Sequence, residues 1–308
     1  MKFVYANSPQ QEADFIIIGV ADESGSHSSR SGSKKGADAI RKVAHERCVF
    51  KRKGRFSLAQ VSSGRIDKKI YDYGNVDKKK ISKVVEVFKD KTPIILGGDH
   101  SITAEVLKGM KDVTVIYFDA HPDIVSSMHG YYGSVLSDVE VDLGHSIEIG
   151  IREPEIEELK NIKKKRLEIV TAEEIYELGL EKVWEKIKRK VKGRVYVSVD
   201  LDVFDPSIAP GVSAPVPGGL NFNQVLYLMK RIMKKLDVVG FDIMELNPRY
   251  DQDERTAHLA VKLLLEMIVN CEHPNKRKLV VKAEKVKEEI KESKKKDKKK
   301  DKDQKTLI

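Results

Sequence analysis

The sequence predicts an α/β protein in which a parallel β-sheet carries helices on both faces. Between residues 90 and 270, short runs rich in valine and isoleucine alternate with longer segments whose apolar residues recur at helical spacing. Three of the runs, ending at Leu96, Phe118 and Val199, are nearly continuous in apolar residues, as strands buried on both faces are. Such alternation is typical of a sheet built from β-α-β units.

Several further elements can be placed along the chain. Phe15–Val20 is expected to be the first strand, and a helix is expected to begin at Gly36 after a loop rich in serine and glycine. Residues 51–80 predict irregular structure with one or two short strands. Thr171 has the spacing of a helix cap, and a longer helix is expected to end at Lys192.

The length allows one large α/β domain or two smaller ones, and the cysteine content indicates a reducing compartment. The 308 residues are 40% hydrophobic, and we expect a single domain over residues 1–273. No run reaches the ~20 apolar residues of a membrane span, and no secretory signal is visible at the N-terminus. The two cysteines, Cys48 and Cys271, lie far apart and do not indicate a disulfide scaffold. A cytoplasmic protein is expected.

The positive charge is concentrated at one end of the chain. Residues 274–308 contain 15 lysines and arginines against 7 acidic residues, which accounts for most of the net charge of +9. This extension is expected to be helical and then disordered. It holds no aromatic residue for base stacking, which argues against nucleic-acid binding. A non-catalytic or nucleic-acid-binding protein that acts through this basic tail is the alternative from a different class.

The central feature is the run from Val113 to Asp123, an apolar strand followed by potential metal ligands at alternate positions. These are Asp119, His121 and Asp123. Residues two apart in extended chain project to the same side, and Pro122 favours extended backbone at His121. The run therefore predicts ligands at the carboxyl end of a strand, where open α/β sheets place active sites. Taken alone, it fits a strand with a polar turn equally well.

Two other apolar strands also end in polar residues. One leads to Asp200 and Asp202, and the other leads to Asp99 and His100. His100 is the better ligand candidate of its pair, because Asp99 is equally suited to cap the next helix. Carboxylates and imidazoles at three strand ends predict a metal site with more than one ion.

These motifs resemble the ureohydrolase family, which includes arginases, agmatinases and formimidoylglutamases, over about residues 15 to 270. The matching segments are Gly97-Gly98-Asp99-His100-Ser101, Asp119-Ala120-His121-Pro122-Asp123, Ser198-Val199-Asp200-Leu201-Asp202, and Gly240-Phe241-Asp242-Ile243-Met244-Glu245-Leu246-Asn247-Pro248. The resemblance implies a three-layer α/β/α fold with a doubly wound, mainly parallel sheet. It also implies two Mn²⁺ ions per subunit and a homotrimer or homohexamer.

The resemblance further implies a role for each matching side chain. One Mn²⁺ would be held by His100, Asp119, Asp123 and Asp200, and the other by His121, Asp119, Asp200 and Asp202. A hydroxide bridging the two ions would attack the carbon of a linear guanidine or amidine. Asp123 would pass a proton to the leaving nitrogen, and Glu245 would hold the cationic guanidinium. His129 matches a histidine that shuttles protons in arginases and agmatinases.

The substrate is indicated less clearly. The loop from Asp123 to His129 is shorter than in typical arginases and lacks their Ser-Gly-Asn stretch, which favours an agmatinase-like enzyme that converts agmatine to putrescine and urea. Residues 210–215 and 247–251 are more similar to formimidoylglutamases, so a formimidoylglutamase or an arginase is the alternative. Glu155 lies where arginases carry an acid for the substrate amino group, or it is a charge at a helix start.

Overall fold

The computed structural model describes residues 1–48, 51–52, 55–56 and 66–272. Residues Met1–Cys271 form one compact unit. The extension predicted for residues 274–308 lies outside the described residues. No helix within the described ranges is both long and apolar enough to cross a membrane.

An eight-stranded sheet forms the centre of this unit, and every pairing in it is parallel. The strands lie in the order β4-β1-β5-β10-β9-β6-β7-β8. Their bounds are β1 (Phe15–Val20), β4 (Ile70–Val76), β5 (Thr92–Leu96), β6 (Val113–Phe118), β7 (Ile147–Ile151), β8 (Glu168–Thr171), β9 (Arg194–Val199) and β10 (Asp237–Ile243). A separate antiparallel pair consists of β2 (Lys51–Arg52) and β3 (Arg55–Phe56).

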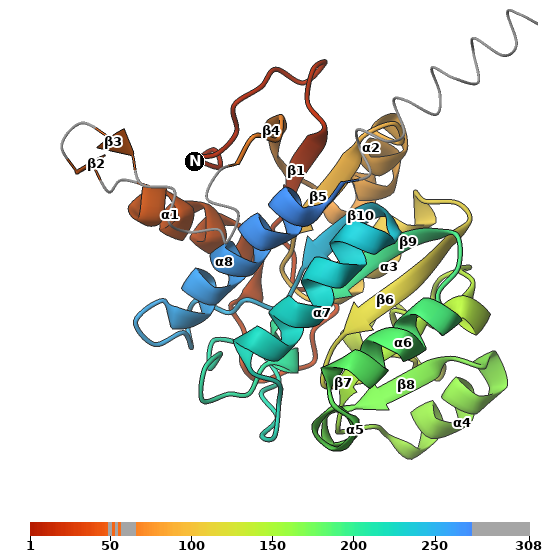
Figure 1. The fold of residues 1–308 in the computed structure, drawn as a ribbon. Coiled ribbons are helices and arrows are strands. Elements are labelled where there is room, and N and C mark those ends of the chain that lie inside the picture. The colour runs from red at the N-terminus through yellow and green to blue at the C-terminus, as the bar shows by residue number, and fades with distance from the viewer. Residues whose placement is uncertain (49–50, 53–54, 57–65, 273–308) are drawn as a thin grey trace, which may run out of the picture. The chain divides into compact units, whose positions relative to one another are not determined.

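Helices cover both faces of the sheet (Figure 1). One apolar cluster joins the sheet to α1, α5, α6, α7 and α8, and a second joins the opposite face to α2, α3 and α4. The α-helices are α1 (Gly36–Cys48), α2 (Ile81–Val87), α3 (Ser101–Lys108), α4 (Ile156–Lys165), α5 (Ala172–Leu178), α6 (Leu180–Lys190), α7 (Phe222–Lys235) and α8 (Arg255–Asn270). Short 3₁₀ helices lie at Ser33–Lys35, Lys78–Lys80, Tyr132–Ser134, Leu143–His145 and Leu201–Val203. The predicted α/β/α fold with a parallel sheet is confirmed.

Local predictions can be compared with the elements directly. The first strand and the start of α1 lie where they were predicted. The Thr171 hydroxyl accepts a hydrogen bond from the Glu174 amide and caps α5, as its spacing indicated. The predicted helix end at Lys192 was wrong by two residues. Helix α6 ends at Lys190, because Val191 has extended backbone and a buried side chain.

The strand order brings distant parts of the sequence together. Strands β5, β10, β9 and β6 are consecutive neighbours in the middle of the sheet, although β9 and β10 follow β6 in the chain. Because all four are parallel, their carboxyl ends lie at one edge of the sheet. The segments after Leu96, Phe118, Val199 and Ile243 therefore meet at that edge.

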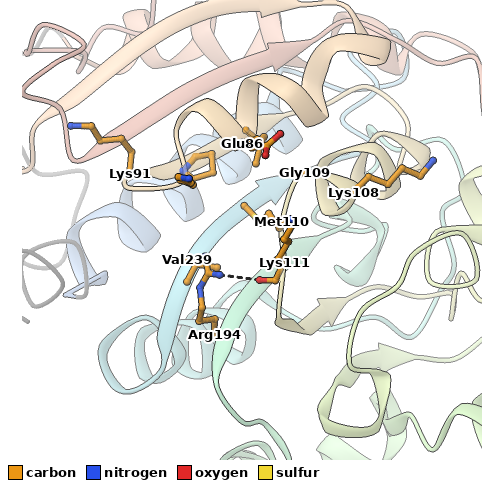
Figure 2. Close-up of a pocket in the computed structure, with 11 residues that line it drawn as sticks. Glu86, Lys91, Lys108, Gly109, Met110, Lys111, Arg194 and Val239 are labelled. Carbon is orange, nitrogen blue, oxygen red and sulfur yellow. Dashed lines mark hydrogen bonds between the residues drawn. The ribbon is translucent and has the colours of Figure 1, made fainter. Parts of the chain in front are cut away.

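A cavity of about 430 Å³ opens at the opposite edge, where β5, β9 and β10 begin (Figure 2). Its lining includes Lys89, Lys91, Lys108, Lys111 and Arg194. Helices α2 and α3 both end here, so these cations offset the partial negative charge of two helix C-termini. Arg194 Nη1 also donates to the Lys111 carbonyl at 2.9 Å. This cavity is thus separate from the carboxyl ends of the strands.

Candidate metal centre

The carboxyl edge of the central strands gathers all of the predicted metal ligands. His100 follows β5, Asp200 and Asp202 follow β9, and the other three follow β6, namely Asp119, His121 and Asp123. Five of the six side chains are buried, and His121 is partly exposed. Two sets of ligand atoms, each lying within 4.8 Å of one another, come from His100, Asp119 and Asp200 and from Asp119, His121 and Asp202.

The first set surrounds one imidazole nitrogen. His100 Nδ1 lies 3.0 Å from Asp119 Oδ2, 3.2 Å from Asp200 Oδ2 and 3.3 Å from Asp123 Oδ2. The imidazole is completely buried. One nitrogen and three carboxylate oxygens from three strand ends therefore converge on a single point.

The second set lies on the open side of the cluster. His121 Nδ1 is 3.0 Å from Asp202 Oδ2 and 3.5 Å from Asp119 Oδ1. The His121 side chain is 23% exposed, and the exposed carboxylate of Glu153 lies 3.6 Å from its Nε2. Because Asp119 belongs to both sets, two cation positions would be adjacent.

The buried atoms of this cluster fit divalent metal ions. Among the described residues, His100 Nδ1 and Asp119 Oδ2 are buried and make no hydrogen bond, although they lie 3.0 Å from each other. A buried polar atom without a partner is costly, and a metal ion would satisfy both atoms. Imidazole nitrogens with carboxylate oxygens form a donor set that suits ions such as Mn²⁺.

The electrostatics of the carboxylates point the same way. Burial, together with the negative charge of Asp119, raises the pKa of Asp123 well above its usual value. Burial and the charges of Asp202 and Asp119 do the same to the pKa of Asp200. The pKa of Asp119 is lowered to about 2 by its contacts with His100 and His121, and a metal ion between the four aspartates would favour the ionised form of the others.

Two side-chain turns direct the ligands. Asp119 Oδ1 accepts a hydrogen bond from the His121 amide at 2.7 Å, and Asp200 Oδ1 accepts one from the Asp202 amide at 2.7 Å. Aspartate readily forms this bond to the amide two residues on. In each motif, the first carboxylate thus folds the chain so that the next ligand turns back toward it.

The three ligands after β6 meet by a different route from the predicted one. Extended backbone was expected to carry Asp119, His121 and Asp123 to the same side. The strand instead ends at Phe118, and Asp123 has a left-handed φ of 48°, a conformation that aspartate tolerates better than most residues. Tight turns, and not strand alternation, therefore make these side chains converge.

Glu245 adds a further buried carboxylate beside the cluster. Its Oε1 accepts a hydrogen bond from the His100 amide at 2.9 Å, whereas its buried Oε2 has no partner in the described part of the chain. Burial raises the pKa of Glu245 to about 8. A neighbouring cation would favour its ionised form. Gly98, whose carbonyl accepts a hydrogen bond from the Glu245 amide, lets the backbone of Asp22 approach closely, because a Cβ there would lie 1.7 Å from the Asp22 carbonyl oxygen.

The remaining candidates lie around the cluster. Asp99 accepts hydrogen bonds from the amides of Gly25 and Ser101, so it orders the backbone beside His100. The His129 side chain is 79% exposed, and its Nδ1 lies 2.6 Å from Asp138 Oδ1. Within the described residues, no hydrogen bond or ion pair joins His129 to the six predicted ligands. Glu155 is the N-cap of α4, which supports the interpretation as a helix-start charge.

Sequence reasoning did not single out the residues behind His100. His100 Nε2 lies 2.8 Å from Ser198 Oγ, which in turn donates to Asp242 Oδ1 at 2.7 Å. A hydrogen bond on the far nitrogen fixes the orientation of a ligating imidazole. Ser198 and Asp242 are polar residues near the ends of mainly apolar, buried strands, and that contrast is the signal that could have found them.

Comparisons with known proteins agree on one family. A family model described as the arginase family matches residues 13–269. The chain is 32% identical over 274 residues to the proclavaminate amidinohydrolase of Streptomyces clavuligerus, covering 83% of this chain and 87% of that one. It is 31% identical over 279 residues to an agmatinase of Neisseria meningitidis serogroup C, covering 84% and 87%. The solved structure of the agmatine ureohydrolase of Thermoplasma volcanium aligns with a TM-score of 0.75 at 31% identity, covering 90% and 96%.

Proposed function

Since the chain belongs to the arginase family and is a metal-dependent ureohydrolase, we propose that it hydrolyses agmatine to putrescine and urea with two Mn²⁺ ions per subunit. The observation that carries this proposal is the pair of buried atoms at the centre of the cluster that make no hydrogen bond among the described residues, His100 Nδ1 and Asp119 Oδ2. The carboxylates around them would be stabilised by bound cations, and imidazole nitrogens with carboxylate oxygens suit Mn²⁺.

The six predicted ligands would hold two ions, with Asp119 and Asp200 shared between both positions. The first ion would be held by His100, Asp119, Asp123 and Asp200, and the second by His121, Asp119, Asp200 and Asp202. When bound, the ions supply an acidified water nucleophile and polarise the guanidine carbon.

The chain's own groups would then bind and orient the substrate. Glu245 would hold the planar guanidinium through its free Oε2, because a carboxylate and a guanidinium form a charge-assisted hydrogen bond. Asp123, buried beside His100, would pass a proton to the leaving nitrogen. His129 would exchange protons with solvent from the rim, where Asp138 orients its ring.

Agmatine is favoured over arginine by the surroundings of the open side. The exposed Glu153 carboxylate lies beside His121, where the distal end of a substrate would leave the site. A carboxylate at this place attracts a terminal ammonium and repels a terminal carboxylate. The agmatinase of Neisseria meningitidis and the agmatine ureohydrolase of Thermoplasma volcanium are relatives whose names carry this same substrate.

We also propose a cytoplasmic homotrimer or homohexamer, with residues 1–273 as a single catalytic domain and residues 274–308 as an extension outside it. Size-exclusion chromatography with light scattering would measure the number of subunits. A monomer with full activity would contradict this part of the proposal.

The direct test is the release of urea or ammonia by the Mn²⁺-loaded protein. Agmatine, arginine, formimidoylglutamate and guanidinobutyrate would be compared side by side at equal concentration. We expect the highest kcat/KM with agmatine, and the highest value with another of the four would reassign the substrate. Asp200→Ala is the control, because it removes a ligand shared by both ions and should abolish turnover and bound metal together.

A further inference from the structure

Tyr117 is a buried side chain directly behind the predicted first metal position. It is the last residue but one of β6, and it packs into the apolar cluster on the side of α2 and α3. In register it lies between Ser198 of β9 and Glu148 of β7. Sequence reasoning placed it in a strand without assigning it a role.

The aromatic ring of Tyr117 touches one predicted ligand. It stacks on the imidazole of His100 with the ring centroids 4.5 Å apart and an angle of 8° between the planes. Both rings are fully buried. Since Ser198 holds His100 Nε2 at 2.8 Å, the imidazole is fixed both at its face and at its far nitrogen.

The hydroxyl of the same side chain touches another predicted ligand. Tyr117 Oη donates to Asp123 Oδ2 at 2.8 Å. That carboxylate oxygen is the one that lies 3.3 Å from His100 Nδ1, so it faces the predicted ion. Asp123 lies after the end of β6 with a left-handed φ of 48°, where regular structure does not fix its direction.

We propose that Tyr117 is a positioning residue that holds His100 and Asp123 together as ligands of the first metal ion. This inference rests on the function proposed above. Its ring contacts a residue that follows β5, and its hydroxyl contacts a residue beyond β6, so one side chain aligns ligands from two strand ends. Partners that orient metal ligands in this way typically change metal affinity or activity by about 10- to 100-fold when they are removed.

The two metal positions should depend on Tyr117 to different extents. In the described part of the chain, Tyr117 makes no hydrogen bond, ion pair or ring contact with His121 or Asp202, which belong to the second position alone. Asp202 is instead held by the Ala120 amide, which donates to its Oδ1 at 3.0 Å. Loss of the Tyr117 hydroxyl should therefore lower the affinity for the first ion and leave the affinity for the second ion unchanged.

Tyr117→Phe tests this, because it removes the hydroxyl and keeps the ring on His100. Mn²⁺ binding to the full chain would be followed by the electron paramagnetic resonance signal of free Mn²⁺. We expect one of two dissociation constants to rise by about 10- to 100-fold while the other stays within about twofold. Equal binding of both ions by the variant and the wild type would overturn the inference.

Thr114→Val is the matched control. Thr114 is also buried in β6, but it lies at the opposite end of the strand from the predicted ligands, and its hydroxyl donates to the Lys192 carbonyl at 3.0 Å. This variant removes a comparable hydrogen bond and should leave both dissociation constants within about twofold of the wild type. If both variants lost affinity for one ion selectively, the cause would be a general loosening of the fold, and the inference would be overturned.

A double-mutant cycle shows whether Tyr117 acts through Asp123. Tyr117→Phe should change the affinity for the first ion little in a chain that already carries Asp123→Ala, because the acceptor is gone. Fully additive effects would contradict the proposed role.

If the wild-type chain bound no Mn²⁺, the proposed function itself would fail. Two bound ions in the wild type and no selective loss in Tyr117→Phe would reject this inference alone.

Discussion

Glu245 is a buried carboxylate with one oxygen occupied and one oxygen unpartnered among the described residues. The first oxygen binds the His100 amide, so the direction of the second is fixed by the backbone beside the metal cluster. This fixed and buried carboxylate is suited to a planar cation that is brought to the metal ions. In the proposed function, substrate binding would be separate from metal binding, because Glu245 belongs to neither set of ligand atoms.

Glu245→Gln should therefore lower catalysis without removing the metal. The variant keeps the shape of the side chain and loses its charge. A hydrogen bond to a charged group contributes about 1.5–3 kcal/mol, so kcat/KM for agmatine should fall by about 10- to 150-fold. The Mn²⁺ content after dialysis should stay at the wild-type level. An unchanged kcat/KM would show that the guanidinium is held elsewhere.

Glu148, the second residue of β7, is another buried carboxylate of this kind. Both of its oxygens are buried and have no hydrogen-bond partner within the described ranges. Burial, followed by the charges of Asp119 and Asp123, raises the pKa of Glu148 well above its usual value. The folded protein therefore holds Glu148 as a neutral acid at a pH at which the unfolded chain has lost that proton.

The pH dependence of stability should report this proton. The pKa of Glu148 is higher in the folded protein than in the unfolded chain. Glu148 therefore does not destabilise the fold below the unfolded pKa of about 4.5, and its destabilising effect grows as the pH rises toward the folded pKa. In metal-free protein, the free energy of unfolding of the wild type should fall relative to Glu148→Gln by about 1.4 kcal/mol per pH unit above pH 5. Urea unfolding at pH 5, 6, 7 and 8 would measure it. Parallel pH profiles for the two proteins would show that Glu148 is ionised in the fold.

At the scale of elements, the ends of the strands could be predicted and the turns that follow could not. Apolar runs located β5, β6 and β9, and the polar residues just after them identified the predicted ligands. The left-handed backbone of Asp123 and the side-chain turn at Asp119 left no signal in the sequence, because both depend on which amides lie nearby. Strand β4 also escaped a specific prediction, since an edge strand buries few residues and shows no apolar run.

One acidic residue of α4 fixes the loop that carries the predicted catalytic groups. Glu157 Oε1 accepts hydrogen bonds from the amides of Ser126 and Ser127 at 2.8 and 2.9 Å, and both hydroxyls also donate to its carboxylate. These hydrogen bonds lower the pKa of Glu157 to about 2. The short loop between Asp123 and His129 is thus tied to a helix instead of being held by its own side chains.

Glu157→Ala should loosen this loop and leave the rest of the molecule unchanged. The amide hydrogens of residues 124–129 should exchange about 3- to 10-fold faster in this variant than in the wild type at pH 7. In the wild type, the protection of these amides should be present above pH 4.5 and be lost as the pH falls toward 2, because the depressed pKa stabilises only the ionised form. Glu177→Ala, at an exposed helix position, is the control. Equal protection in both variants would contradict the role of Glu157.

For the whole molecule, the order of the strands determines the site, and the sequence does not reveal that order. Alternating strands and helices indicate a parallel sheet, but they do not indicate that β9 and β10 lie between β5 and β6. Without that insertion, His100 would follow a strand adjacent to β6, and Asp200 would lie elsewhere. The polar residues at three strand ends predicted a metal site, but the division of the six ligands between two ions came only from the resemblance to a family.

The distribution of charge over the whole chain leads to a last prediction. Residues 274–308 carry most of the net charge of +9, whereas all the groups proposed to act in hydrolysis lie before residue 246. A chain that ends at residue 273 should therefore hydrolyse agmatine with a kcat/KM within about twofold of the full chain, since it keeps every group proposed to act in hydrolysis. A large fall in kcat/KM would place the extension in the catalytic unit. Binding of RNA or DNA that weakens steeply with salt, and disappears with the extension, would instead assign these lysines a separate role.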